Sequence, residues 1–150
     1  AVNALATTAS ALYIGGAFTS YRGSSTNYLA KLDLASGVKD TGFSQLGGPN
    51  GSISALGVSA TALYIGGSFA GYRNNSVSNL GKLDLVTGVL DQSFSQSSGS
   101  NLGVSVIAVS GGTLYVGGAF TFYRGSLPSS AAYGAMAVDA ANGNPSTTGF

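Results

Sequence analysis

The side chains that could do acid–base or ion-pair chemistry in this 150-residue chain are six basic and five acidic ones. The sequence contains neither histidine nor cysteine, so it lacks the residues that most often bind zinc, iron and copper. No serine can be activated by a histidine, and the G-x-S-x-G pattern of a nucleophile elbow is absent. We therefore expect no cofactor and no bound metal, and an enzyme is the least favoured class of protein.

Ten of these eleven charges fall on four positions of a segment that repeats along the chain, and only Lys39 stands outside the pattern. The four positions hold Arg22, Arg73 and Arg124; Asp33, Asp84 and Asp139; Asp40 and Asp91; and Lys31 and Lys82. A catalytic carboxylate pair needs two groups in different environments, so the repetition argues against Asp33 and Asp40 as a glycoside-hydrolysing pair. One carboxylate per unit, such as Asp40, also falls short of the several oxygen ligands that calcium takes. The pattern favours a structural framework in which an arginine fork bridges carboxylates and backbone carbonyls between strands or repeats.

A tyrosine precedes each repeated arginine, and these pairs are the candidate ligand-binding residues. They are Tyr21 and Arg22, Tyr72 and Arg73, and Tyr123 and Arg124. An aromatic ring beside a guanidinium suits stacking and hydrogen bonding to sugars or anionic groups. The loops that follow the pairs differ in length and chemistry, as binding loops on a rigid scaffold do. These loops are residues 23–28, 74–79 and 125–134. Ligand binding is therefore the functional alternative to the structural framework.

The elements that must position these residues come from one copied unit. The octet ALYIGGAF at residues 11–18 returns as ALYIGGSF at 62–69 and as TLYVGGAF at 113–120, 51 residues apart both times. A fixed period of this length indicates a single supersecondary unit copied along the chain. The three units span residues 1–51, 52–102 and 103–150, and together they are expected to form a single repeat domain.

Each octet predicts a strand that is covered on both faces, because its alternating residues carry no charge on either side. Each octet also contains two consecutive glycines. The pairs are Gly15 and Gly16, Gly66 and Gly67, and Gly117 and Gly118. Glycines that recur at one place inside a strand predict a bulge or the close approach of a neighbouring backbone.

Three further strands are expected in each unit. A short apolar strand opens the unit at residues 2–7, 53–58 and 104–109. A half-exposed third strand follows the octet at residues 29–34, 80–85 and 135–140, and then comes a tight turn whose last residue is glycine. A fourth strand is expected at the D-x-x-F motif of residues 40–43 and 91–94, and at its decayed form in residues 147–150.

Four short strands per unit predict an all-β protein made of three tandem, four-stranded blades like those of a β-propeller. A β-trefoil, which also has three four-stranded units of about fifty residues, is the alternative fold. Closed propellers have roughly four to eight blades, so three blades leave two open faces. The expected partners are therefore further repeats of a longer chain or the chain itself as a homo-oligomer, for example two copies in a six-bladed ring.

The pattern L-Y-[IV]-G-G-x-F, then Y-R, L-x-x-L-D and D-x-x-F, resembles the delta-sixty repeat, a predicted propeller repeat of large bacterial surface and fibre proteins. The third unit departs from it, since Ala137 replaces the lysine of KLD and Thr147 replaces the aspartate. The resemblance implies an extracellular, non-enzymatic module of the bacterial cell surface, with a structural or adhesive role in a fibre or adhesin. It implies no particular functional residues.

The amino-acid composition argues against nucleic acid and membranes as partners. Only 7% of residues are charged and the formal net charge is +1, so the chain has no basic field for nucleic acid. No apolar run approaches the eighteen or so residues of a membrane-spanning helix, so membrane insertion is not expected. The alternative to a structural or adhesive module is a lectin-like module that binds cell-surface glycans through several weak sites.

Overall fold

The computed structural model describes residues 1–43, 47–94, 99–124 and 134–146, and within these ranges the chain is all-β. Three antiparallel sheets of three strands each carry the fold. Sheet 1 contains β1 (Val2–Thr7), β2 (Ala11–Gly16) and β5 (Leu29–Asp33). Sheet 2 contains β6 (Ser52–Val58), β7 (Ala62–Ser68) and β10 (Leu80–Asp84). Sheet 3 contains β11 (Val104–Ser110), β12 (Thr113–Gly118) and β13 (Ala135–Asp139).

Each main sheet draws its strands from one unit, and the octet strand is always the middle one. The strand orders are β1-β2-β5, β6-β7-β10 and β11-β12-β13. Two short hairpins follow the octets of the first two units. These are β3 (Ser20–Tyr21) with β4 (Ser24–Ser25), and β8 (Gly71–Tyr72) with β9 (Asn75–Ser76). Because no main sheet combines strands from different units, the arrangement favours separate stacked sheets over a β-trefoil.

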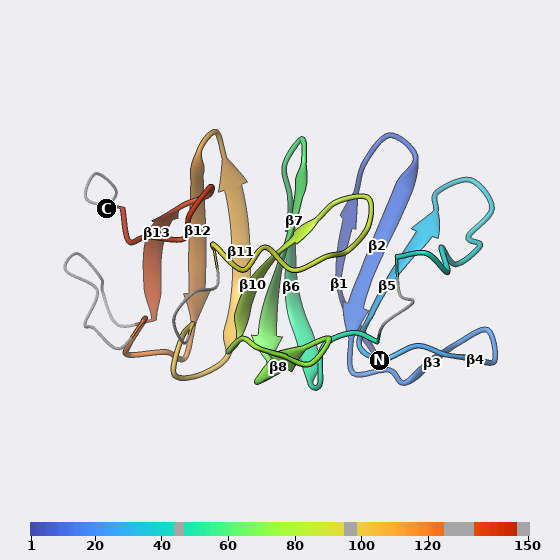
Figure 1. Ribbon diagram of the computed structural model, residues 1–150, viewed down its shortest axis with the longest axis horizontal. Helices are drawn as coiled ribbons and strands as arrows, with labels where there is room; N and C mark the ends of the chain where they lie inside the picture. The colour runs from blue at the N-terminus through green and yellow to red at the C-terminus, as the bar shows by residue number, and fades with distance from the viewer. Residues whose placement is uncertain (44–46, 95–98, 125–133, 147–150) are drawn as a thin grey trace.

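The sheets stand side by side in chain order along the longest axis of the molecule (Figure 1). Strand β6 contacts both β1 and β2 of the preceding sheet, and β11 contacts β6 and β7 in the same way. The opening strands of the second and third units therefore pack against the sheet before them. The described residues form no closed ring, and their outer sheets each keep one face without a neighbouring sheet.

The fourth strand predicted at the D-x-x-F motif does not form in the first two units. Only one bridge is found at each place, between Leu32 and Lys39 and between Leu83 and Leu90. In the first unit the Asp40 carboxylate then accepts hydrogen bonds from the backbone N–H groups of Gly42 (2.9 Å) and Phe43 (3.2 Å). An aspartate that bonds its own following backbone favours a turn over a strand. The third-unit form, residues 147–150, lies outside the described residues.

The bulge predicted at the paired glycines is present in every unit. The register shifts between Val2 and Ala4, opposite Gly16 and Gly15, and the shift recurs at the same place in sheets 2 and 3. A Cβ added to Gly16 would lie 2.1 Å from the Ala1 carbonyl oxygen, which is far inside van der Waals contact. The second glycine of each pair therefore allows the opening strand to approach the octet strand closely.

Buried side chains fill the spaces between neighbouring sheets. One hydrophobic cluster lies between sheets 1 and 2 and includes Tyr13, Ile53 and Ile65. A second lies between sheets 2 and 3 and includes Tyr64 and Val104. We call each of these two contacts between neighbouring sheets a joint. The two joints contain most of the core, so the stability of the molecule depends on the stacking of its units. No helix that could cross a membrane is found in the described ranges.

Candidate functional site

The tyrosines of the second and third Tyr–Arg pairs are buried and attached to the turn of their own unit. The Tyr72 hydroxyl donates to the Gly88 carbonyl at 2.7 Å, and the Tyr123 hydroxyl donates to the Gly143 carbonyl at 2.9 Å. Both tyrosines are only 1–2% exposed. Burial raises the pKa of Tyr72 to about 12. Neither ring offers a free face on which a sugar could stack.

The arginines of these two pairs connect neighbouring units. Nη2 of Arg73 donates to the Phe43 carbonyl of the preceding unit and, at 3.3 Å, to the Thr87 carbonyl of its own turn. Nη2 of Arg124 repeats both contacts, with the carbonyls of Phe94 and, at 2.8 Å, Asn142. The guanidinium carbons lie 5.3 and 5.5 Å from the centres of the adjacent tyrosine rings. The arginine fork thus joins backbone carbonyls across each joint.

The first pair is the most accessible of the three. Tyr21 is half-buried and donates to the Gly37 carbonyl at 2.8 Å, whereas Arg22 is exposed and stacks 5.6 Å from the Tyr21 ring centre. Unlike Arg73 and Arg124, Arg22 bonds no carbonyl of another unit among the described residues. Of the six predicted ligand-binding residues, these two remain the best placed to contact a ligand.

The repeated lysines and the second set of aspartates form ion pairs that also reach across the joints. Lys31 Nζ lies 3.0 Å from Asp40 Oδ2 and 3.3 Å from the Val86 carbonyl oxygen of the next unit. Lys82 repeats this arrangement with Asp91, at 2.9 Å. Partial burial raises the pKa of Asp40, but the Lys31 ammonium and the backbone donors outweigh it, so that the pKa is lowered overall. These carboxylates are ionised ion-pair partners and are poorly suited to donate a proton at neutral pH.

The remaining aspartates cap the turns that follow the third strands. Asp33 accepts hydrogen bonds from the backbone N–H (2.7 Å) and the hydroxyl (2.6 Å) of Ser36, and Asp84 bonds Thr87 in the same way. The Ser36 hydroxyl and N–H lower the pKa of Asp33. The predicted turn glycine follows each cap at positive φ, as with Gly37 at 66°. The described ranges hold no cluster of three or more potential metal-ligating side chains.

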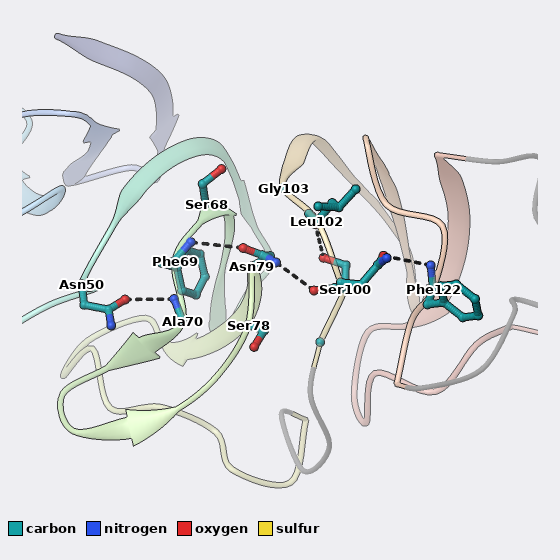
Figure 2. A pocket seen from close by; sticks show the side chains of 12 residues that line it. Asn50, Ser68, Phe69, Ala70, Ser78, Asn79, Ser100, Leu102, Gly103 and Phe122 are labelled. Atoms are coloured by element: carbon teal, nitrogen blue, oxygen red, sulfur yellow. Dashed lines mark hydrogen bonds between the residues drawn. The ribbon is translucent and has the colours of Figure 1, made fainter.

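A groove of about 680 Å³ lies between sheets 2 and 3 and is lined by neutral residues only (Figure 2). Asparagine side chains hold its walls in place. Asn50 Oδ1 accepts from the backbone N–H groups of Ala70 and Gly71, both at 2.9 Å. Asn79 crosses the groove floor, because its Nδ2 donates to the Ser100 carbonyl at 2.8 Å. The groove is therefore a preformed, uncharged surface that combines amide groups with apolar side chains.

One wall of this groove carries an exposed aromatic ring. Phe122 has 43% of its surface exposed, and its backbone N–H donates to Asn101 Oδ1 at 2.9 Å. An open aromatic face beside amide groups suits the apolar and polar faces of a neutral sugar. We did not predict this groove from the sequence. The signal for it is the pair Asn50 and Asn101, which are 51 residues apart and cap equivalent backbone.

Comparison with known proteins agrees with the repeat architecture. Residues 12–43 match a family model described as a domain of unknown function (DUF5122) beta-propeller. This short segment of the first unit is similar to a β-propeller repeat family. The match covers β2 to β5 and the turn after them, including the bridge at Lys39. No curated protein matches the chain.

A solved structure shares the fold at low sequence identity. The crystal structure of the computationally designed Ika8 protein superposes with a TM-score of 0.57 at 13% identity. The alignment covers 97% of this chain and 48% of the designed one, so the chain spans about half the length of that structure. At this identity the likeness concerns the fold alone.

Proposed function

We propose that this chain is a three-blade segment of a β-propeller-type array, of the delta-sixty kind, with a structural or adhesive role and no catalytic activity. Each sheet with its bridged fourth segment corresponds to one blade. The segment would belong to an extracellular protein of the bacterial surface, such as a fibre or an adhesin. The family match over residues 12–43 of the first unit supports the propeller part of this proposal.

The observation that carries the proposal is that both joints use the same contacts. At each joint a tyrosine hydroxyl and a lysine bond carbonyls of the next unit, while an arginine bonds a carbonyl of the preceding one. Apart from the exposed Arg22, the repeated charges are thus committed to backbone groups and to one another. Such joints produce a rigid, repetitive body, as a spacer or a display scaffold requires.

Two measurements test this proposal. Antibodies against the chain should label intact cells of the source organism, and labelling only after permeabilisation would contradict a surface location. The purified chain should also show no turnover across glycoside, ester and peptide substrates. Hydrolysis that is lost in Asp84→Asn would contradict the absence of catalytic activity.

The groove between sheets 2 and 3 favours a second candidate function, a lectin-like module that binds neutral glycans. A glycan array probed with the native chain tests it directly. Binding that disappears in Phe122→Ala but persists in Arg22→Ala would place the sugar in the groove. The opposite result would place it at the exposed Tyr21 and Arg22 pair. Silence across the array would leave the structural role alone.

A further inference from the structure

The two joints inside the molecule are built on a small residue that receives a branched one from the next sheet. A Cβ added to Gly15 would lie 2.5 Å from Ile53 Cγ2, so Ile53 occupies the space that a side chain at residue 15 would need. Val104 occupies the equivalent space at Gly66, where its Cγ1 is 2.5 Å from the added Cβ. The first glycine of each pair is therefore the receiving point of a joint.

Sheet 3 carries the same receiving surface, and no sheet of the described residues lies against it. Gly117 is the equivalent of Gly15 and Gly66, yet the nearest atoms to its added Cβ are 3.7 Å away and belong to its own unit. Around it, Val106 is 60% exposed, and Ala108 is exposed as well. We call this surface the receiving face.

Sheet 1 carries the complementary surface, which has no neighbouring sheet in the part of the chain that the structure describes. Val2 and Leu5 are the equivalents of Ile53 and Leu56, which insert into the first joint. Val2 is 53% and Leu5 62% exposed, whereas Ile53 is completely buried and Leu56 is 9% exposed. We call this surface the inserting face. Val2 and Leu5 therefore expose apolar surface together on one sheet face, and such a patch is expected to bind a partner.

We propose that the receiving face of one copy binds the inserting face of a second copy, and that two such head-to-tail joints close six sheets into a ring. The two faces are the same surfaces that already bind each other twice within the chain. The residues named on them are uncharged, so the contact desolvates no charge. The proposal rests on the blade-like stacking of the proposed function, which it extends to a specific partner surface.

The hydrogen bonds of the internal joints indicate how strong the joint between two copies should be. Tyr115 and Leu34 are the equivalents of Tyr13 and Leu85, whose hydroxyl and carbonyl are 2.7 Å apart in the first joint. They would meet in the same way between copies. Ala137 stands where Lys31 bonds the next unit, so that hydrogen bond has no counterpart. The joint between copies is therefore weaker than the internal ones and reversible on dilution.

Engineered cysteines test the joint, because the chain has none of its own. A Cβ built on Gly57 lies 3.8 Å from Ile107 Cβ, which is the separation that a disulfide takes. The equivalent pair across the proposed joint is Ala108 of one copy and Leu5 of the other. Chains carrying only Ala108→Cys and chains carrying only Leu5→Cys are mixed, oxidised and weighed by mass spectrometry. We expect covalent pairs that contain one chain of each kind.

Three results would overturn the proposal: no covalent pairs, pairs of like chains only, or a ladder of larger products from one chain that carries both cysteines. Like pairs would show that identical faces meet, and a ladder would show an open filament instead of a ring.

A control variant, Gly57→Cys with Ile107→Cys, should form its disulfide within one chain. If that bond forms while the mixed chains fail to link, the stacked fold stands and only the docking is wrong. If it fails, the stacking itself is wrong. A variant with Val89→Cys in place of Leu5→Cys measures random collision.

Discussion

The Tyr64 hydroxyl donates a hydrogen bond to the Ala140 carbonyl, 2.8 Å away and 76 residues further along the chain. Tyr13 makes the equivalent bond to Leu85 at 2.7 Å. Both bonds run from the octet strand of one unit to the turn of the next. They fix the spacing of neighbouring sheets where the octet strand meets the turn that follows the third strand of the next unit.

Tyr64→Phe should lower the free energy of unfolding by about 1 kcal/mol, because it leaves a buried carbonyl without its donor. Tyr115→Phe is the matched control. Its ring is 38% exposed in the single chain, so water can replace a lost partner and the effect should be smaller. Urea unfolding at a low protein concentration compares the two variants. Equal losses would contradict the role of the Tyr64 hydroxyl in the joint.

Gly66→Val should destabilise the fold by roughly 2 kcal/mol or more, because the new side chain would overlap Val104. Gly117→Val should leave unfolding of the single chain nearly unchanged, since the added Cβ has room. The same Gly117 variant should weaken self-association by blocking the receiving face. Urea unfolding and sedimentation at several concentrations measure the two effects separately. A Gly117→Val chain that associates as well as the native chain would contradict the proposed joint.

Stability should fall as the pH rises from 10 towards 12. The pKa of Tyr72 is about 12 in the folded chain against an ordinary value of 10.0, so the unfolded chain releases this proton first. In that window the folded state binds more protons, and the loss reaches roughly 2 to 3 kcal/mol above pH 12. Tyr72→Phe should reduce this slope, although it starts from a lower stability. Thermal unfolding followed across the alkaline range shows whether the two slopes differ, and identical slopes would exclude Tyr72 as the cause.

Arg73→Lys should cost about 2 kcal/mol, nearly as much as Arg73→Ala, because a lysine cannot bond the carbonyls of Phe43 and Thr87 with one planar fork. Arg22→Ala is the control, since Arg22 is exposed and joins no preceding unit. It should change the free energy of unfolding by less than about 0.5 kcal/mol. Full rescue by lysine would mean that charge alone, and not the fork, holds the joint.

The sequence predicted the strands well because each strand occurs in three copies, and the apolar pattern can be compared among them. The opening, octet and third strands lie within one residue of their expected positions in sheets 1 to 3, apart from the earlier end of two octets. The bulge at the paired glycines follows from the missing side chain of Gly16 and its equivalents, and the positive φ of Gly37 follows from the conformational freedom of glycine. At the bulge and at the turn, the residue types alone were sufficient to predict the backbone structure.

The prediction was less successful where the outcome depended on side-chain hydrogen bonds or on contacts between units. The D-x-x-F segment looks like a strand in isolation, but Asp40 bonds the N–H groups of Gly42 and Phe43 and ends the pairing. The repeated arginines were expected to bridge carboxylates as well as carbonyls, and the described bonds of Arg73 reach carbonyls alone. The groove beside Phe122 arises only when sheets 2 and 3 come together. The Phe43 carbonyl that Arg73 bonds and the facing walls of the groove lie far from these residues in sequence.

The solution mass of the 150-residue chain, measured by light scattering across a dilution series, tests the account most directly. Stacked sheets with a receiving face and an inserting face predict twice the mass of one chain at high concentration, and dissociation to single folded chains on dilution. A folded chain that stays monomeric at every concentration would contradict the proposal that the two open faces bind each other.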